Sequence, residues 1–226
     1  MTASIASPQA LERLVLEMGF LPFFCNSIPG FSVEEHTPPE LWFSPQREGP
    51  WDWKGPVANG GHCVYGKFFQ GKAGFVSLAW FPHLANYRRG GYDFEARYED
   101  GLAPWKDRQI YCALQSHGSL LTRELKVQCG YGRGGQRGFE TVITRLQMMT
   151  YVNIQDFECR RDAHGLPYGW PTARYTTPEA QFGPSAVCSA YDDAPQASGE
   201  RILAHLRTLL PHAEERQLLA LLGTMS

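Results

Sequence analysis

The segment Phe139-Glu-Thr-Val-Ile-Thr-Arg-Leu-Gln-Met-Met-Thr-Tyr151 decides the fold that this sequence predicts. Its apolar residues Phe139, Val142, Ile143 and Leu146 follow the i, i+3, i+4, i+7 spacing of one buried helical face. We therefore expect a helix that turns this face to the core. The opposite face would carry Thr141, Thr144, Arg145 and Met148 outward.

Two further helices are expected before this segment. The first covers Lys106–His117. The second is short, lies within residues 118–130, and would be capped by Thr122 and ended by Gly130. Two helices joined by a glycine-rich turn are typical of a helix-turn-helix.

A β-hairpin is expected after the segment. Tyr151–Arg161 is rich in β-branched and aromatic residues, Asp162–Pro167 carries turn signals, and Tyr168–Thr177 has the pattern of a returning strand. Three helices followed by a hairpin is the order of a winged helix. The sequence therefore predicts an α+β fold with a winged helix-turn-helix domain over residues 104–178.

The remaining chain predicts two flanking parts. Residues 1–103 form an aromatic-rich α+β region, with a helix over Ser7–Phe20 and a β-hairpin built from Val64–Phe69 and Lys72–Ser77. Residues 179–226 form a loop and a helical tail. For this tail we favour packing against the core, with dimerisation as the alternative.

Composition places the chain among folded proteins. It has 226 residues, of which 43% are hydrophobic and 19% charged. No apolar run approaches the roughly 20 residues of a membrane helix, and the N-terminus lacks the pattern of a signal peptide. We therefore expect a cytoplasmic protein with no membrane contact. The six cysteines are scattered without a C-x-x-C pair, so we expect free thiols, no metal site and no cofactor.

The charge is unevenly distributed. Residues 106–161 hold nine Lys and Arg against five Asp and Glu, a balance of +4, whereas the whole chain carries −2, which leaves −6 elsewhere. A basic module within an acidic chain is typical of a nucleic-acid contact. An ordinary solvated helix surface is the alternative, and charge alone does not separate the two.

The predicted winged helix assigns roles to its polar residues. Thr141, Thr144 and Arg145 would face bases in the major groove of double-stranded DNA. Phosphates would be held by the basic residues of the turn, the second helix and the wing, which are Arg123, Lys126, Arg133, Arg137, Arg160 and Arg161.

Other basic residues lie in the N-terminal region. Lys67 and Lys72 flank the turn of the first hairpin, where they would contact phosphates or protect a strand edge. Arg88 and Arg89 offer a further phosphate contact or an ordinary ion-pair network with nearby acidic residues.

The segment Gly49-Pro-Trp-Asp-Trp-Lys-Gly-Pro56 is unusual in composition. Two tryptophans, Trp51 and Trp53, bracket Asp52, and a proline lies near each end. Such a rigid segment with flat apolar faces could stack a base or a sugar. A structural clip is the alternative, and we favour it.

Three stretches together resemble the bacterial proteins described as AlkZ-related. They are Gly49–Pro56, Tyr65-Gly-Lys-Phe-Phe-Gln-Gly-Lys-Ala-Gly-Phe-Val-Ser77 and Thr144-Arg-Leu-Gln-Met-Met-Thr-Tyr151. The resemblance covers most of the chain. It implies a distant relationship to winged-helix DNA glycosylases, and hence a role in DNA repair or maintenance.

The resemblance also implies where catalysis would lie. The glycosylases carry a Gln-x-Gln or Gln-x-Asp pair that positions the attacking water, and Gln147-Met148-Met149 keeps only the first glutamine. Methionine can neither activate nor orient water. Asp156 is a candidate carboxylate to stabilise a cationic sugar, with an outward strand position as the alternative. Gln147 and Asp156 are thus the candidate catalytic residues.

Three functions follow from these patterns. The first is a DNA-binding winged-helix protein of DNA repair or maintenance, and the second is an active base-excision enzyme of the same kind. The third is a transcription regulator, or a winged helix used only for protein contacts. The sequence does not predict the oligomeric state.

Overall fold

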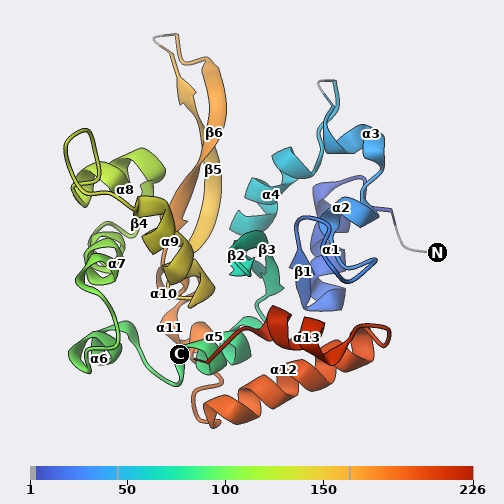
Figure 1. The fold of residues 1–226 in the computed structure, drawn as a ribbon. Coiled ribbons are helices and arrows are strands. Elements are labelled where there is room, and N and C mark those ends of the chain that lie inside the picture. Colours follow the sequence, from blue (N-terminus) through green and yellow to red (C-terminus); the bar gives the residue numbers. More distant parts are fainter. Residues whose placement is uncertain (1–3, 45, 163, 226) are drawn as a thin grey trace.

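The structure is a computed structural model that describes residues 4–44, 46–162 and 164–225 (Figure 1). Its helices are α1 Pro8–Met18, α2 Val33–His36, α3 Pro39–Trp42, α4 Pro50–Asn59, α5 Phe81–Arg89, α6 Phe94–Glu99, α7 Trp105–His117, α8 Thr122–Gln128, α9 Phe139–Met148, α10 Pro178–Phe182, α11 Pro184–Val187, α12 Pro195–Leu209 and α13 Glu215–Leu222. Its strands are β1 Phe20–Pro22, β2 Cys63–Phe69, β3 Lys72–Ser77, β4 Ser119–Leu121, β5 Asn153–Arg161 and β6 Pro167–Thr176.

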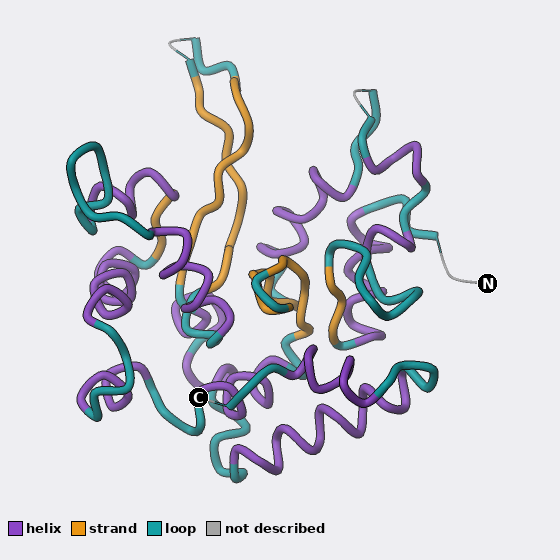
Figure 2. Tube along the Cα trace, in the orientation of Figure 1, coloured by secondary structure: helices purple, strands orange, loops and turns teal. Residues whose placement is uncertain are grey.

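Within the described residues the strands form one six-stranded antiparallel sheet in the order β1-β3-β2-β5-β6-β4. The fold is therefore mixed α and β. The β2–β5 pairing, through Tyr65 and Ile154, joins the N-terminal hairpin to the later one. Figure 2 shows the β5–β6 hairpin extending well beyond the body of the molecule.

Helices cover the sheet at both ends. In Figure 1, α1 and α4 lie beside the β1–β3–β2 end and α7 and α8 lie beside the β4 end, whereas α9 packs on β2. At the bottom of that view α12 packs on α5, and α13 folds back along α12. Within the described residues, every helix is too short or too polar to cross a bilayer.

The predicted elements of the N-terminal region are confirmed. The Ser7 side chain accepts a hydrogen bond from the Ala10 amide at 3.1 Å and caps α1, which ends at Met18. The turn between β2 and β3 places Gln70 at φ 53° and Gly71 at φ 77°. Positive φ at both central residues is the conformation that favours glycine in a two-residue hairpin.

The region from α7 to β6 contains the predicted helices and hairpin with three differences. A short strand, β4, precedes α8 and pairs with β6. Helix α9 ends at Met148, three residues early. Thr122 is not the cap of α8: the cap is Leu121, whose amide donates to Glu124 at 2.9 Å, while the Thr122 hydroxyl donates to the Ala173 carbonyl.

The segment Gly49–Pro56 forms the first part of helix α4, which the sequence did not predict. Pro50 occupies the first helical turn, and the Asp52 carboxylate accepts from the Gly49 amide at 2.9 Å. Pro56 lies inside the helix, where a proline usually signals an end. Burial of Trp53, Val57 and Ala58 against the core stabilises the helix in spite of it.

Candidate nucleic-acid interface

Helix α9 presents the face that the sequence predicts. Phe139, Val142, Ile143 and Leu146 are buried, and Thr141 is exposed. The outward residues Thr141, Thr144, Arg145 and Met148 form one wall of a groove of about 1280 Å³. The C-terminal segment lines the groove as well, with Leu219, Ala220, Gly223, Thr224 and Met225. The outward face of α9 therefore lies along a groove, and Thr141 and Met148 are its most exposed residues.

Arg145 is held by a buried partner. Its guanidinium donates to both oxygens of Asp107, whose side chain is 2% exposed, with Nε 2.9 Å from Oδ2. The hydrogen bond that Arg145 donates to Asp107 raises the pKa of Arg145. This bidentate pair joins α9 to α7, so Arg145 has a structural partner at the position predicted to face bases.

The first hairpin contacts α9. The Lys67 Nζ donates to the Thr144 hydroxyl at 3.3 Å. At Gly71 in the turn, an added Cβ would lie 3.5 Å from the Thr144 methyl group. Lys72 is exposed beside this turn. Lys67 is therefore next to the predicted recognition helix, whereas Lys72 lines a separate pocket with residues of the C-terminal segment.

The strongest basic feature is the loop between α8 and α9. Arg133 and Arg137 in this loop and Arg123 on α8 are exposed, and none of them forms an ion pair with a carboxylate of the described residues. Lys126 differs, because its Nζ donates to Glu140 at 3.0 Å. Arg160 and Arg161 have their backbone in β5, but their side chains lie outside the described part of the chain.

Two arginines proposed from the sequence as phosphate contacts are buried. Arg89 is 1% exposed and pairs with Glu179 at 2.5 Å, not with the acidic residues nearby in sequence. Arg88 is 4% exposed and donates to the carbonyls of Leu221, Leu222 and Met148. Their prediction as a phosphate contact is wrong because both guanidinium groups tie distant segments together inside the core.

Gln147 is buried rather than on the surface. Its Oε1 accepts from the Lys67 amide at 3.1 Å, and its Nε2 donates to the Ile143 carbonyl at 3.0 Å. Both ends of the amide are thus engaged: the oxygen joins α9 to β2, and the nitrogen bonds within α9. We do not propose Gln147 as a water-positioning residue.

The candidate carboxylate Asp156 and the neighbouring Glu158 both lie on β5. Asp156 is half-buried, its Oδ1 accepts from the Phe157 amide at 2.7 Å, and it lies close to Gly55 of α4. Glu158 is paired with Arg174, whose hydrogen bond lowers the pKa of that carboxyl. Neither carboxylate contacts Gln147.

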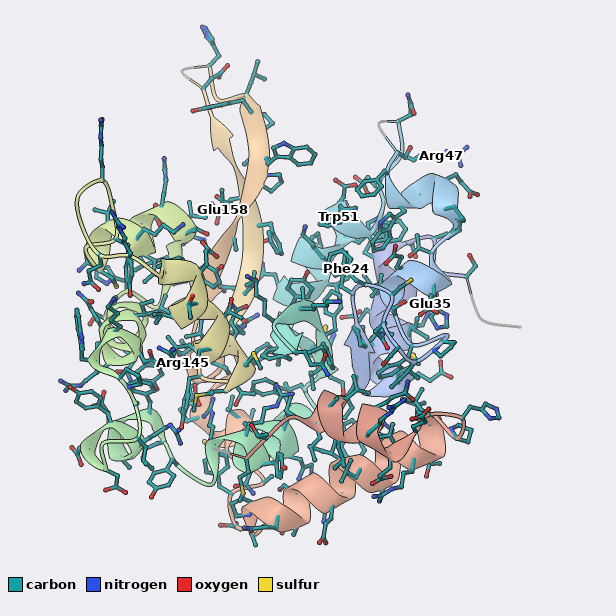
Figure 3. The ribbon with its side chains drawn as sticks, in the orientation of Figure 1. Phe24, Glu35, Arg47, Trp51, Arg145 and Glu158 are labelled. Atoms are coloured by element: carbon teal, nitrogen blue, oxygen red, sulfur yellow. The ribbon has the colours of Figure 1, made fainter. Side chains whose placement is uncertain are left out.

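The two tryptophans of the segment Gly49–Pro56 lie in different environments. Trp53 is 3% exposed, so its prediction as a stacking platform is wrong. Trp51 is half-buried and lines a second cavity of about 670 Å³. Figure 3 shows Trp51 and Arg145 on either side of the hairpin that carries Glu158. Trp51, the remaining candidate for stacking, therefore does not share a face with the α9 groove.

The cavity beside Trp51 contains residues that the sequence analysis did not single out. It is lined by side chains of α3, α4 and β6, among them Trp42, Phe43, Lys54 and Trp170. The sequence carried one signal for this cavity, namely Trp170 beside Pro171 in the returning strand. A strand that faces solvent seldom contains a tryptophan.

A comparison with models of protein families decides the relationship. The model described as AlkZ related matches residues 5–223. The chain belongs to the AlkZ-related family. Comparisons with curated proteins and with solved structures found no match.

The three stretches that carry the AlkZ-related resemblance meet around β2. Helix α4 and helix α9 both pack on β2, and the second stretch is β2 with β3. The stretches that carry the family resemblance thus lie largely in the core.

Within the described residues, no group of His, Cys, Asp and Glu side chains could hold a metal ion.

Proposed function

We propose that this AlkZ-related chain binds double-stranded DNA through a winged helix formed by residues 104–178. The order α7, β4, α8, α9, β5, β6, with β4 paired to β6, supports this assignment. The same order of helix, strand, helix, helix and hairpin is found in winged-helix domains, whose third helix faces DNA. Membership of the AlkZ-related family suggests a relationship to DNA repair.

The contact would centre on the N-terminal turn of α9. Thr141 is exposed there, directly after the loop that carries Arg133 and Arg137. Recognition helices contact base edges mainly with their N-terminal residues. Thr144 and Arg145, which are engaged with Lys67 and Asp107, would contribute less than Thr141.

The exposed, unpaired arginines carry the proposal. Arg123, Arg133 and Arg137 pair with no described carboxylate, so their charge is available to phosphates. Lys126 is partly neutralised by Glu140 and would add less. We propose further that Arg160 and Arg161 contact the backbone from the wing, and Lys67 and Lys72 from the first hairpin.

The test is duplex binding across a salt series. Each phosphate contact contributes about 0.9 to the slope of log affinity against log salt. A variant with Arg123→Ala, Arg133→Ala and Arg137→Ala should bind more weakly and lose roughly 2 to 3 from that slope. Arg145→Ala is a poor choice, because it would leave Asp107 buried without its partner.

The matched control is Arg13→Ala. Arg13 is also exposed and pairs with no described carboxylate, but it lies on α1 near the opposite edge of the sheet. Its loss should leave affinity and slope unchanged. Wild-type binding by the triple variant would overturn the proposed interface. Absence of duplex binding by the wild type would leave the α9 groove as a surface for protein contacts.

A further inference from the structure

The second cavity lies on the other side of the wing hairpin from α9. Its volume is about 670 Å³, which is within the usual range of small-molecule sites. One wall is the end of α3 and the start of α4, with Trp42, Phe43 and Trp51, and the opposite wall is β6, with Trp170. We call this cavity the aromatic cleft.

The walls of the aromatic cleft expose an unusual amount of flat apolar surface. Trp170 is 91% exposed and Phe43 is 76% exposed, although large aromatic residues are normally mostly buried. Phe43 is anchored by stacking on Trp51, with ring centroids 5.9 Å apart and planes 18° apart. Aromatic surface held open on two opposite walls suits a flat ring between them.

The cleft also contains hydrogen-bond donors. Lys54 is 9% exposed, and its Nζ lies 4.4 Å from the Trp51 ring centroid and 4.3 Å from that of Phe157. No carboxylate of the described residues forms an ion pair with it. The indole Nε1 of Trp51 is buried and has no hydrogen-bond partner among the described residues. Two donors beside aromatic walls complement a ligand rich in acceptors.

The charge in the cleft disfavours a cationic ligand. Burial lowers the pKa of Lys54 to about 8, so its ammonium group is still mainly protonated at pH 7. It occupies a ring face of Trp51 that a cation would otherwise use. The nearest carboxylate on the wall, Asp52, is exposed and already accepts the Gly49 amide.

We propose that the aromatic cleft is a binding site for an uncharged flat heterocycle with hydrogen-bond acceptors on its edge, a nucleobase, held between Phe43 and Trp170 with Lys54 as the polar contact. The base could be free, as a nucleoside, or unpaired within DNA. The second source rests on the proposed DNA binding, and the first does not.

The test uses 2-aminopurine, whose fluorescence is quenched when it stacks on an aromatic ring. It would be offered as the free riboside, in a single strand, unpaired in a duplex and paired in a duplex. The full-length protein should quench the riboside and the unpaired base but not the paired one. Stacking contributes about 1–3 kcal/mol per base, so Trp170→Ala should weaken binding by about 5- to 160-fold. Trp170 is too exposed for its loss to unfold the chain.

Two controls sharpen the result. Trp105→Ala removes a tryptophan that is 55% exposed and lies on α7, outside the cleft. This variant should leave quenching unchanged. Adenosine should compete better than 1-methyladenosine, whose ring is cationic at pH 7, and Lys54→Met should remove that preference. Equal loss in both tryptophan variants, or no quenching of the riboside and the unpaired base, would overturn the proposal.

The outcome separates this site from the proposed function. Quenching of the riboside without duplex binding would sustain the aromatic cleft and remove the DNA interface. Salt-sensitive duplex binding without quenching of any unpaired base would sustain the DNA interface and remove the cleft site.

Discussion

The ammonium group of Lys54 lies against Trp51 and Phe157 and forms no ion pair with a described carboxylate. Burial without an ion partner disfavours the charged form, which is why the pKa of Lys54 falls to about 8. The residue therefore costs the folded state free energy at neutral pH. Such a cost is expected where a residue serves binding rather than stability.

Lys54→Met should raise the free energy of unfolding at pH 7 by about 1–3 kcal/mol. The lysine pKa is lower in the folded chain, about 8, than in the unfolded chain, roughly 10.4. Below pH 8 both states hold the proton and the full cost is present. From pH 8 upward the folded state releases its proton first. The difference in free energy of unfolding between the variant and the wild type therefore shrinks until about pH 10.4.

Urea unfolding of both proteins across this pH range measures the effect. Lys72→Met, which removes an exposed lysine from β3, should show no pH-dependent difference from wild type. A stability gap for Lys54→Met that stays constant from pH 7 to pH 10.4 would contradict the burial argument.

At the scale of elements, α9 is fixed to its neighbours by side chains on two sides. Arg145 pairs with Asp107 of α7, and Gln147 bonds the Lys67 amide of β2. The buried amide of Gln147 leaves no unsatisfied group, because its Nε2 also has a partner. The position of α9 relative to the sheet therefore depends on polar contacts as well as on its apolar face.

Gln147→Leu should lower the free energy of unfolding by about 1–3 kcal/mol, because the part-buried Lys67 amide would lose its acceptor and the buried side chain of residue 147 its hydrogen bonds. Thermal or denaturant unfolding measures it. Gln128→Leu, at the exposed end of α8, is the matched control and should change little. If both variants were equally stable, Gln147 would have no structural role and its catalytic assignment would regain support.

Sequence periodicity predicted the elements that have one strong buried face. Helix α9 and the β2–β3 hairpin are of this kind, since their spacing and turn residues are local. Helix α4 was not predicted, because Pro56 and Gly55 mask its pattern. Residues two apart point to nearly opposite sides of a helix, which is why Trp53 is buried while Trp51 lines the cleft.

At the scale of the whole molecule, one sheet runs from β1 to β4 through the first two predicted regions, residues 1–103 and 104–178. The pairing of β2 with β5 carries backbone hydrogen bonds across the proposed division at residue 103, whereas the described part of residues 179–226 contributes no strand. The aromatic cleft depends on this continuity, because α4 and Trp170 meet only when the sheet is formed. Residues more than 100 positions apart that line one cavity, such as Trp51 and Trp170, leave no local pattern in a sequence.

The two proposed sites lie on either side of the β5–β6 hairpin (Figure 3). The basic loop and the N-terminal turn of α9 would hold a duplex on one side. The aromatic cleft would take a base on the other. Because the hairpin lies between them, a base that enters the cleft from bound DNA must come from a strand that passes the hairpin.

We propose that α8, the loop after it and α9 form the DNA contact. Hydrogen exchange of the chain with and without a DNA duplex tests this interface. We expect slower amide exchange within residues 122–148 when the duplex is present, and no change in α1. Unchanged exchange in residues 122–148, with protection confined to α1 or α12, would contradict it.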